Sequence, residues 1–207
     1  MDVLLQLLLN GLMLGGLFAI VSVGLTLIFG IIRIINFAHG ELLMIGMYAT
    51  YLATTQFGVH PYVLAPPLIL GLFVVGALIQ RFILQRVLDA EDVHVQIFAT
   101  VGLSTALINL ALLVFGADIR STPSSGARVP LEFGELQVLS GYLVMFICSI
   151  AVVAGLHLFM DRTDLGRAIR ATAQNRTAAR LMGVNIERIY MITFGIGAAC
   201  IGLASTL

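Results

Sequence analysis

The chain has 207 residues and a formal net charge of zero; 59% of its residues are hydrophobic and only 11% are charged. Charged residues make up about a quarter of an ordinary soluble domain, so this composition excludes a water-soluble globular fold and predicts an all-α, polytopic bundle of transmembrane helices. The balance of charge also removes the electrostatic basis for binding nucleic acid. Cys148 and Cys200 both lie in apolar runs, and their spacing indicates neither a metal site nor a disulfide framework.

The first hydrophobic run covers residues 3–30 and contains no charged residue. A helix of this length would measure about 42 Å at 1.5 Å per residue. Because the hydrocarbon core of a bilayer is about 30 Å thick, we expect this span to be tilted or to extend beyond the membrane. No basic residue precedes the run, which favours a retained span over a cleavable signal peptide.

A polar segment with the sequence N-F-A-H-G-E, residues 36–41, follows the first run. Ionisable residues at membrane depth are costly, and transporters often build their sites from helices that are broken in this way. The alternative is a structural turn in which Asn36 caps the next helix, Gly40 permits close approach and Glu41 lies near the positive helix end. His39 and Glu41 alone do not make a catalytic or metal site, because neither a second histidine at ligand spacing nor a nucleophile is nearby.

Five further apolar runs follow this polar break, so the chain is expected to cross the membrane about six times. The first of these is short, and the last reaches the end of the chain without a polar cap. The runs are residues 42–55, 62–84, 93–115, 141–160 and 189–207. We expect residues 1–207 to form a single transmembrane domain that is truncated at its C-terminus.

Small residues mark the first and the last spans, where they allow helices to pack closely in lipid. Two of them have the G-x-x-x-G spacing. They are Gly11, Gly15 and Gly16 in the first span, and Gly195, Gly197 and Gly202 in the last.

All eleven basic residues are arginines, and six of them fall between residues 162 and 188. Short cytoplasmic loops carry an excess of basic residues, so this stretch is expected to be cytoplasmic. Counting the spans back from it places the N-terminus and the loop of residues 116–140 outside. That loop is rich in serine, proline and glycine, which is typical of a connector; a contact with an external partner is the alternative.

The arginine-rich stretch also predicts a helix, which begins near the acidic Asp164 and stops at Gly183. It combines arginines with small and apolar side chains, so it would suit either docking into a cleft of another protein or lying on anionic lipid. Composition leaves both interpretations open. The candidate coupling residues are Arg167, Arg170, Ala171, Ala178, Ala179, Leu181 and Gly183.

Two motifs together resemble a known family. N-F-A-H-G-E followed by an apolar helix, and G-R-A-I-R-A and A-A-R-L-M-G-V-N followed by a glycine-rich span, are similar to the permease subunits of branched-chain amino acid ABC importers, the H-type most closely. The resemblance covers the whole chain. It implies that residues 171–183 form a cytoplasmic coupling helix that transmits closure of an ATPase to the spans. It also implies that the segment containing Asn36, His39, Gly40 and Glu41 is a helix break near the translocation path.

The resemblance further implies a multi-pass protein of the bacterial inner membrane with several partners. These are a second permease subunit, two ATP-binding-cassette ATPase subunits and an external or periplasmic amino-acid-binding protein. ATP would be used by the partner subunits, because this chain has no G-x-x-x-x-G-K-[ST] phosphate-binding sequence. No metal and no cofactor of its own is expected, and no enzymatic activity.

Three alternative functions compete with this interpretation. Close relatives within the family would import urea or short amides. A secondary transporter or channel acting alone would need ionisable groups deep in the spans, and the apolar runs contain no acid in their middle. A membrane enzyme is disfavoured because paired catalytic groups are missing.

Overall fold

The computed structural model describes residues 2–88, 93–122, 130–133 and 136–207. Its long helices are α1 (Asp2–Ile32), α2 (His39–Phe57), α3 (Ala65–Ile79), α5 (Val93–Phe115), α6 (Ser140–Arg162) and α9 (Ile186–Ala204). Its short helices are η1 (Pro61–Leu64), the π-helical η2 (Gln80–Leu84), α4 (Gln85–Leu88), α7 (Asp164–Gln174) and α8 (Arg176–Leu181). Two strands, β1 (Pro130–Phe133) and β2 (Leu136–Leu139), pair antiparallel, with Pro130 opposite Leu139.

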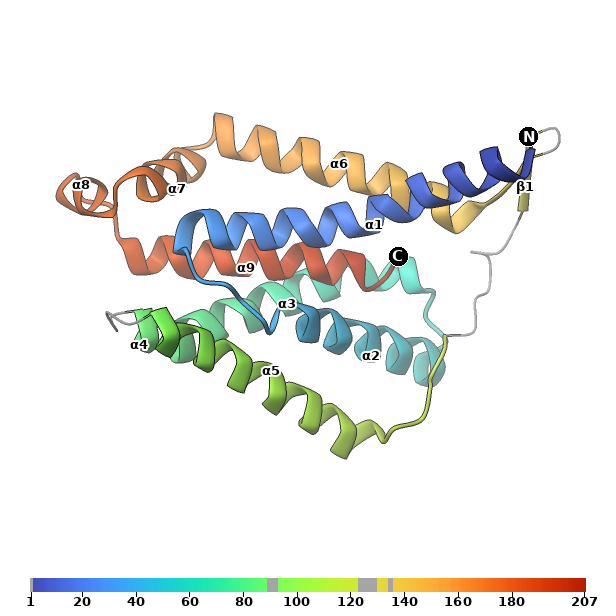
Figure 1. Ribbon diagram of the computed structural model, residues 1–207, viewed down its shortest axis with the longest axis horizontal. Coiled ribbons are helices and arrows are strands. Elements are labelled where there is room, and N and C mark those ends of the chain that lie inside the picture. Colours follow the sequence, from blue (N-terminus) through green and yellow to red (C-terminus); the bar gives the residue numbers. More distant parts are fainter. Residues whose placement is uncertain (1, 89–92, 123–129, 134–135) are drawn as a thin grey trace.

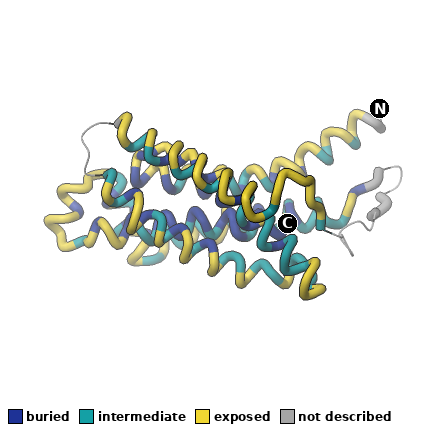
Figure 2. The backbone as a smooth tube through the Cα atoms, turned by 90° about the horizontal axis from the view of Figure 1, so that it is seen from below, coloured by how far each residue is buried: buried dark blue, intermediate teal, exposed yellow. Residues whose placement is uncertain are grey.

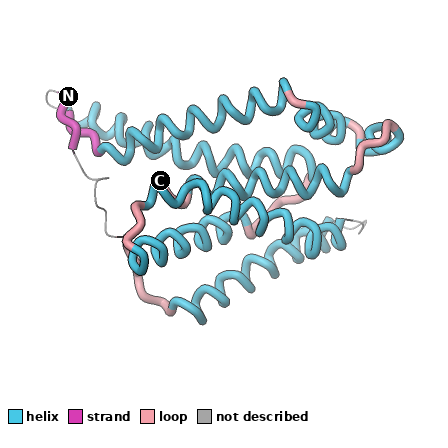
Figure 3. The backbone as a smooth tube through the Cα atoms, turned by 180° about the vertical axis from the view of Figure 1, so that it is seen from behind, coloured by secondary structure: helices cyan, strands magenta, loops and turns pink. Residues whose placement is uncertain are grey.

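The long helices lie side by side and run alternately in opposite directions, which confirms the predicted all-α polytopic bundle (Figure 1). One end of the bundle carries α4, α7 and α8, and the other carries the N-terminus, the strand pair and the end of α9. Figure 3 shows from behind that the strands and most loops lie at the two ends of the bundle, whereas the loop of residues 33–38 runs into it. Apart from the loop of residues 33–38, this arrangement keeps irregular backbone away from the middle of the bundle, as a bilayer requires.

Five helical stretches in the described residues are long and apolar enough to cross a membrane. They are Leu4–Ile32, Pro61–Leu88, His94–Phe115, Ser140–Arg162 and Ile186–Ala204. Five of the six predicted apolar runs therefore correspond to long apolar helices. The sixth, residues 42–55, is also helical but belongs to α2, whose polar residues such as Thr50 and Gln56 lower its hydropathy.

The centre of the bundle is α9, which packs between α1 and α3. Phe194, Ala198 and Ile201 are fully buried in this core. α9 meets α1 closely at Gly24, where an added Cβ would lie 2.8 Å from the carbonyl oxygen of Gly197. Glycine is thus required at this crossing, as the small residues of the last span predicted.

The N-terminal part of α1 projects from the packed core and is largely exposed (Figure 2). The predicted G-x-x-x-G pair lies in this part, and an added Cβ at Gly11 or Gly15 would meet nothing within 4 Å. The prediction that this pair packs against another helix is therefore wrong within this chain. Gly16, one residue further along, does pack, against Ser149 of α6.

The loop predicted over residues 116–140 is not entirely irregular, because β1 and β2 form a short hairpin and β2 leads directly into α6. The alternation of apolar and polar residues in L-E-F, residues 131–133, and L-Q-V, residues 136–138, was the available signal. The strands were missed because each is only four residues long and the composition of the whole loop is typical of a connector. The serine-, proline- and glycine-rich part of this loop, residues 123–126, lies outside the described residues.

Candidate functional site

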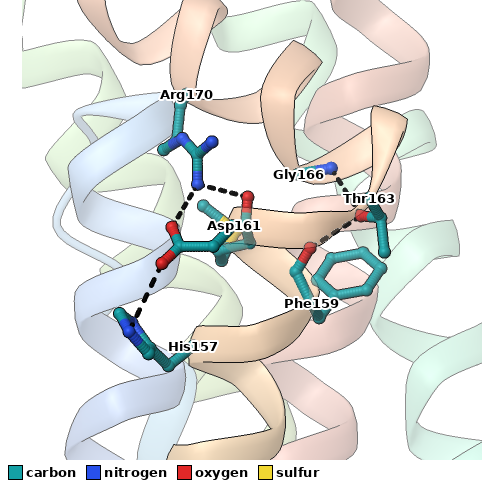
Figure 4. A network of polar contacts seen from close by, with 7 residues as sticks. His157, Phe159, Asp161, Thr163, Gly166 and Arg170 are labelled. Carbon is teal, nitrogen blue, oxygen red and sulfur yellow. Dashed lines mark hydrogen bonds and ion pairs between the residues drawn. The ribbon is translucent and has the colours of Figure 1, made fainter.

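A sharp corner joins α6 to α7 and sets the direction of the arginine-rich segment (Figure 4). The hydroxyl of Thr163 donates to the carbonyl of Phe159 at 2.7 Å and accepts from the backbone N–H of Gly166 at 2.9 Å. Thr163 thereby caps the N-terminus of α7, the role that threonine commonly fills. A side chain at Gly166 would collide with the backbone carbonyls of Phe159 and Met160. Glycine is therefore needed for α7 to fold back so closely.

Arg170 holds this corner closed. Its guanidinium donates to the carbonyl of Met160 and pairs with the carboxylate of Asp161 at 2.5 Å. Asp161 also lies 3.3 Å from the ring of His157, one turn earlier on α6 (Figure 4). A cation at the carbonyl end of a helix is favourable, so Arg170 attaches α7 to the end of α6. The sequence placed Arg170 among docking residues, whereas its described contacts lie within the chain.

The structure divides the single predicted helix into two. α7 ends at Asn175, whose backbone is extended with φ −150° and ψ 104°. The Asn175 side chain accepts a hydrogen bond from the N–H of Ala178 at 3.0 Å and so begins α8. Asparagine caps a helix start well, and this local preference ends the continuous helix that composition predicted. The predicted stop at Gly183 is present, with a left-handed φ of 87°.

The far end of this α7–α8 segment, residues 164–183, is an apolar tip. Leu181 is 83% exposed and Met182 is 84% exposed. Ala171 and Ala178 are also exposed, whereas Ala179 is buried in the core. Of the seven candidate coupling residues, Ala179 thus faces the protein, which runs against an external role. The sequence could not separate Ala178 from Ala179 without the register of α8.

Arg167 remains at the surface, where it pairs with Asp164 three residues earlier on α7. The Arg167 and Asp164 side chains are 60% and 94% exposed. Exposed pairs of this kind contribute about 0–1 kcal/mol to stability. The guanidinium of Arg167 is therefore accessible to a partner at little cost.

Two arginines form reciprocal hydrogen bonds between the end of α1 and the α7–α8 segment. Arg176 of α8 donates to the carbonyl of Ile32 at 2.8 Å, and its guanidinium lies 5.4 Å from the ring centre of Tyr190. In return, Arg33 donates to the carbonyl of Ala173 at 3.3 Å. Each cation satisfies a carbonyl at a helix C-terminus. The two motifs, far apart in sequence, are thereby joined.

These two arginines are functional candidates that the sequence reasoning missed. Arg33 has a left-handed φ of 62°, and its N–H bonds to the carbonyl of Phe29 at 2.9 Å, so it ends α1 as a glycine usually would. A non-glycine residue in this conformation costs of order 1–3 kcal/mol. Arginine just after a long apolar run was the available signal, because cations favour the carbonyl end of a helix.

The polar break after α1 is a loop of residues 33–38, and its last three predicted members, His39, Gly40 and Glu41, belong to the first turn of α2. Asn36 does not cap α2. Its side-chain oxygen accepts from the N–H of Ala38 at 3.1 Å, which shapes the turn before the helix. An added Cβ at Gly40 would meet nothing within 4 Å, so the predicted close approach at this glycine is wrong.

This loop returns into the bundle, so that α2 begins part-way along its neighbours (Figure 1). The buried ring of His39 donates from Nε2 to the carbonyl of Val21 at 3.1 Å. Val21 lies about three turns, or roughly 16 Å, before the end of α1. The hydroxyl of Thr100 on α5 donates to the loop carbonyl of Ile35 at 3.0 Å. Irregular backbone at this depth is tolerated only where protein satisfies it.

Glu41 consequently lies beside the middle of α5, where the hydroxyl of Ser104 donates to Glu41 Oε1 at 2.6 Å. The apolar runs themselves contain no acid in their middle, as expected, but the polar break brings Glu41 beside the middle of α5, which the runs did not predict. Within the described ranges, no cluster of three or more histidine, cysteine, aspartate or glutamate side chains could hold a metal ion.

Comparison with known proteins fits this architecture. The family model described as "Branched-chain amino acid transport system / permease component" matches residues 7–207. The chain belongs to this family of transport permeases. Both sequence motifs and all of the described bundle except residues 2–6 fall within the matched region. Membership of a permease family, together with the long apolar helices, makes the chain a multi-pass membrane protein.

Individual relatives carry the same kind of name. The chain is 32% identical to the high-affinity branched-chain amino acid transport system permease protein BraD of Pseudomonas aeruginosa, covering 98% of this chain and 70% of the relative. It is 31% identical to the corresponding protein LivH of Escherichia coli K12, with the same coverage. A probable LivH of Methanocaldococcus jannaschii is 27% identical over 92% of this chain and 62% of the relative. No solved structure matches.

Proposed function

We propose that the chain is a permease subunit of an ATP-driven importer of branched-chain amino acids in a bacterial inner membrane. The relatives' names support the substrate class. The observation that carries the coupling to a separate motor is the apolar tip of α8, where Leu181 and Met182 are more than four-fifths exposed. Two large apolar side chains together beside arginines are typical of a contact with another protein.

The partners are a second permease subunit, two ATP-binding-cassette ATPase subunits and an external amino-acid-binding protein. The ATPases bind and hydrolyse ATP, and this chain supplies no catalytic group. The positive-inside rule supports a cytoplasmic position for the arginine-rich α7–α8 end, with the N-terminus outside.

The α7–α8 segment is suited to transmitting movement because it is attached at two places. Arg170 attaches α7 to the end of α6, and the reciprocal hydrogen bonds of Arg33 and Arg176 attach the segment to the end of α1. A displacement of the tip by the ATPases would therefore move α1 and α6 with it. α1 leads directly into the loop that carries α2, so the same movement reaches the middle of the bundle.

The test is assembly and transport by the complete complex carrying Leu181→Glu and Met182→Glu. Two charges on the tip should reduce recovery of the ATPases with the permease at least ten-fold, because the apolar contact is lost. Phe57→Glu is the matched control, since Phe57 is 77% exposed at the opposite end of the bundle. Undiminished ATPase recovery with the double change would show that the tip is not the docking element.

A further inference from the structure

A cleft of about 270 Å³ lies between α2 and α5. Its walls are apolar or aromatic. They are Ile45, Tyr48, Ala49, Leu52, Leu107, Leu110, Ala111, Val114 and Phe115. The rings of Tyr48 and Phe115 stack with centres 4.0 Å apart near one end of the cleft. Since one water occupies about 30 Å³ of liquid, the cleft has room for a small aliphatic group.

The opposite end of this cleft leads to the pair of Glu41 and Ser104. On α2, Ile45 and Tyr48 follow Glu41 by four and seven residues, a spacing that places all three on one helix face. On α5, Leu107 follows Ser104 by three residues and lies on the same face as well. The polar pair and the apolar walls are thus consecutive parts of one surface.

The carboxylate of Glu41 is suited to a cationic ligand. Ser104 engages Oε1, and a carboxylate has further acceptor sites on its two oxygens. The ion pairs of the described residues lie at the α6–α7 corner, and none includes Glu41. Glu41 stands in the first turn of α2, where the positive helix end favours an anion without a neighbouring cation. An unpaired carboxylate half-way along an apolar bundle is costly unless it has a function.

We propose that Glu41 and Ser104 bind the ammonium group of the transported amino acid while its aliphatic side chain occupies the α2–α5 cleft. This inference rests on the proposed function and specifies its substrate site. A positive charge beside an aliphatic group complements an unpaired carboxylate beside an apolar cleft. Urea and short amides have neither a cation for Glu41 nor a side chain for the cleft, so the site selects aliphatic α-amino acids.

Glu41→Gln tests the ammonium contact in the complete complex, reconstituted in vesicles with its ATPases and binding protein. Uptake of labelled leucine, divided by the amount of assembled complex, should show a KM raised at least ten-fold, because the amide keeps the shape and removes the charge. Glu41→Asp should recover part of the loss. An unchanged KM in Glu41→Gln would overturn the assignment, even though leucine uptake itself would leave the proposed function intact.

Filling the cleft gives a second test that does not depend on how Glu41→Gln folds. Ala49→Leu places a larger side chain among the cleft walls, so leucine uptake should fall about ten-fold relative to alanine uptake. Ala106→Leu is the matched control on an exposed face of α5 and should leave this ratio unchanged. Equal loss of leucine and alanine uptake in Ala49→Leu would overturn the proposal and indicate that a lipid chain or another helix fills the cleft.

Discussion

Arg176 shows how one side chain can serve two helices. Its guanidinium donates to the carbonyl of Ile32 at the end of α1 and lies over the ring of Tyr190 in α9. A charge-assisted hydrogen bond contributes roughly 1.5–3 kcal/mol, and a partly buried cation–π contact adds about 1 kcal/mol. Together, these two contacts of Arg176 would keep α1 attached to the α7–α8 segment if a partner displaced that segment.

We expect Arg176→Ala to uncouple ATP hydrolysis from transport. The apolar tip and its docking surface remain, so the ATPases should still assemble, whereas leucine uptake per ATP hydrolysed should fall about ten-fold. Arg176→Lys should recover little, because an ammonium cannot reproduce the planar contact of a guanidinium with the ring. Both quantities can be measured on the same reconstituted vesicles.

Arg188→Ala is the control for this prediction. Arg188 lies exposed at the same end of the bundle, and in the described part of the chain only its backbone N–H makes a hydrogen bond, to the side chain of Asn185. Its replacement should leave the ratio of uptake to hydrolysis unchanged. An equal fall in both variants would mean that loss of positive charge at this end, rather than the attachment of α1, explains the result.

At the scale of helices, the long apolar runs could be predicted closely from the sequence. Residues 93–115 coincide with α5, and residues 141–160 lie within α6, because hydrophobicity and the absence of charge reflect the thickness of the bilayer directly. The depth of α2 could not be predicted in this way. It depends on the hydrogen bond from His39 to the carbonyl of Val21, 18 residues earlier in the chain, which only the folded bundle creates.

The candidate sites could likewise be predicted from the sequence only in part. The arginine-rich segment and the polar break both stood out as exceptions to hydrophobicity, and both are real structural features. Their internal geometry did not follow from composition, because Asn175 ends a helix by a local cap and Ala179 faces the core by its register. The partner of Glu41, Ser104, lies 63 residues further along the chain, and no local pattern connects them.

At the scale of the whole molecule, a continuous set of contacts connects the apolar tip to the cleft. The α7–α8 segment bonds to the end of α1, α1 leads through the loop of residues 33–38 to α2, and α2 forms one wall of the α2–α5 cleft (Figure 1). α9 packs against α1 and α3 beside this route. Movement at one end of the bundle can thus alter the shape of the cleft, as alternating access requires.

Under the proposed function, this chain passes aliphatic amino acids through a membrane when separate ATPases hydrolyse ATP. The most direct measurement is uptake of labelled leucine and labelled urea into vesicles that contain the complete complex with its binding protein, with and without ATP on the α7–α8 side. We expect leucine uptake that requires ATP, with urea uptake at background. Urea uptake without leucine uptake, or leucine uptake independent of ATP, would contradict it.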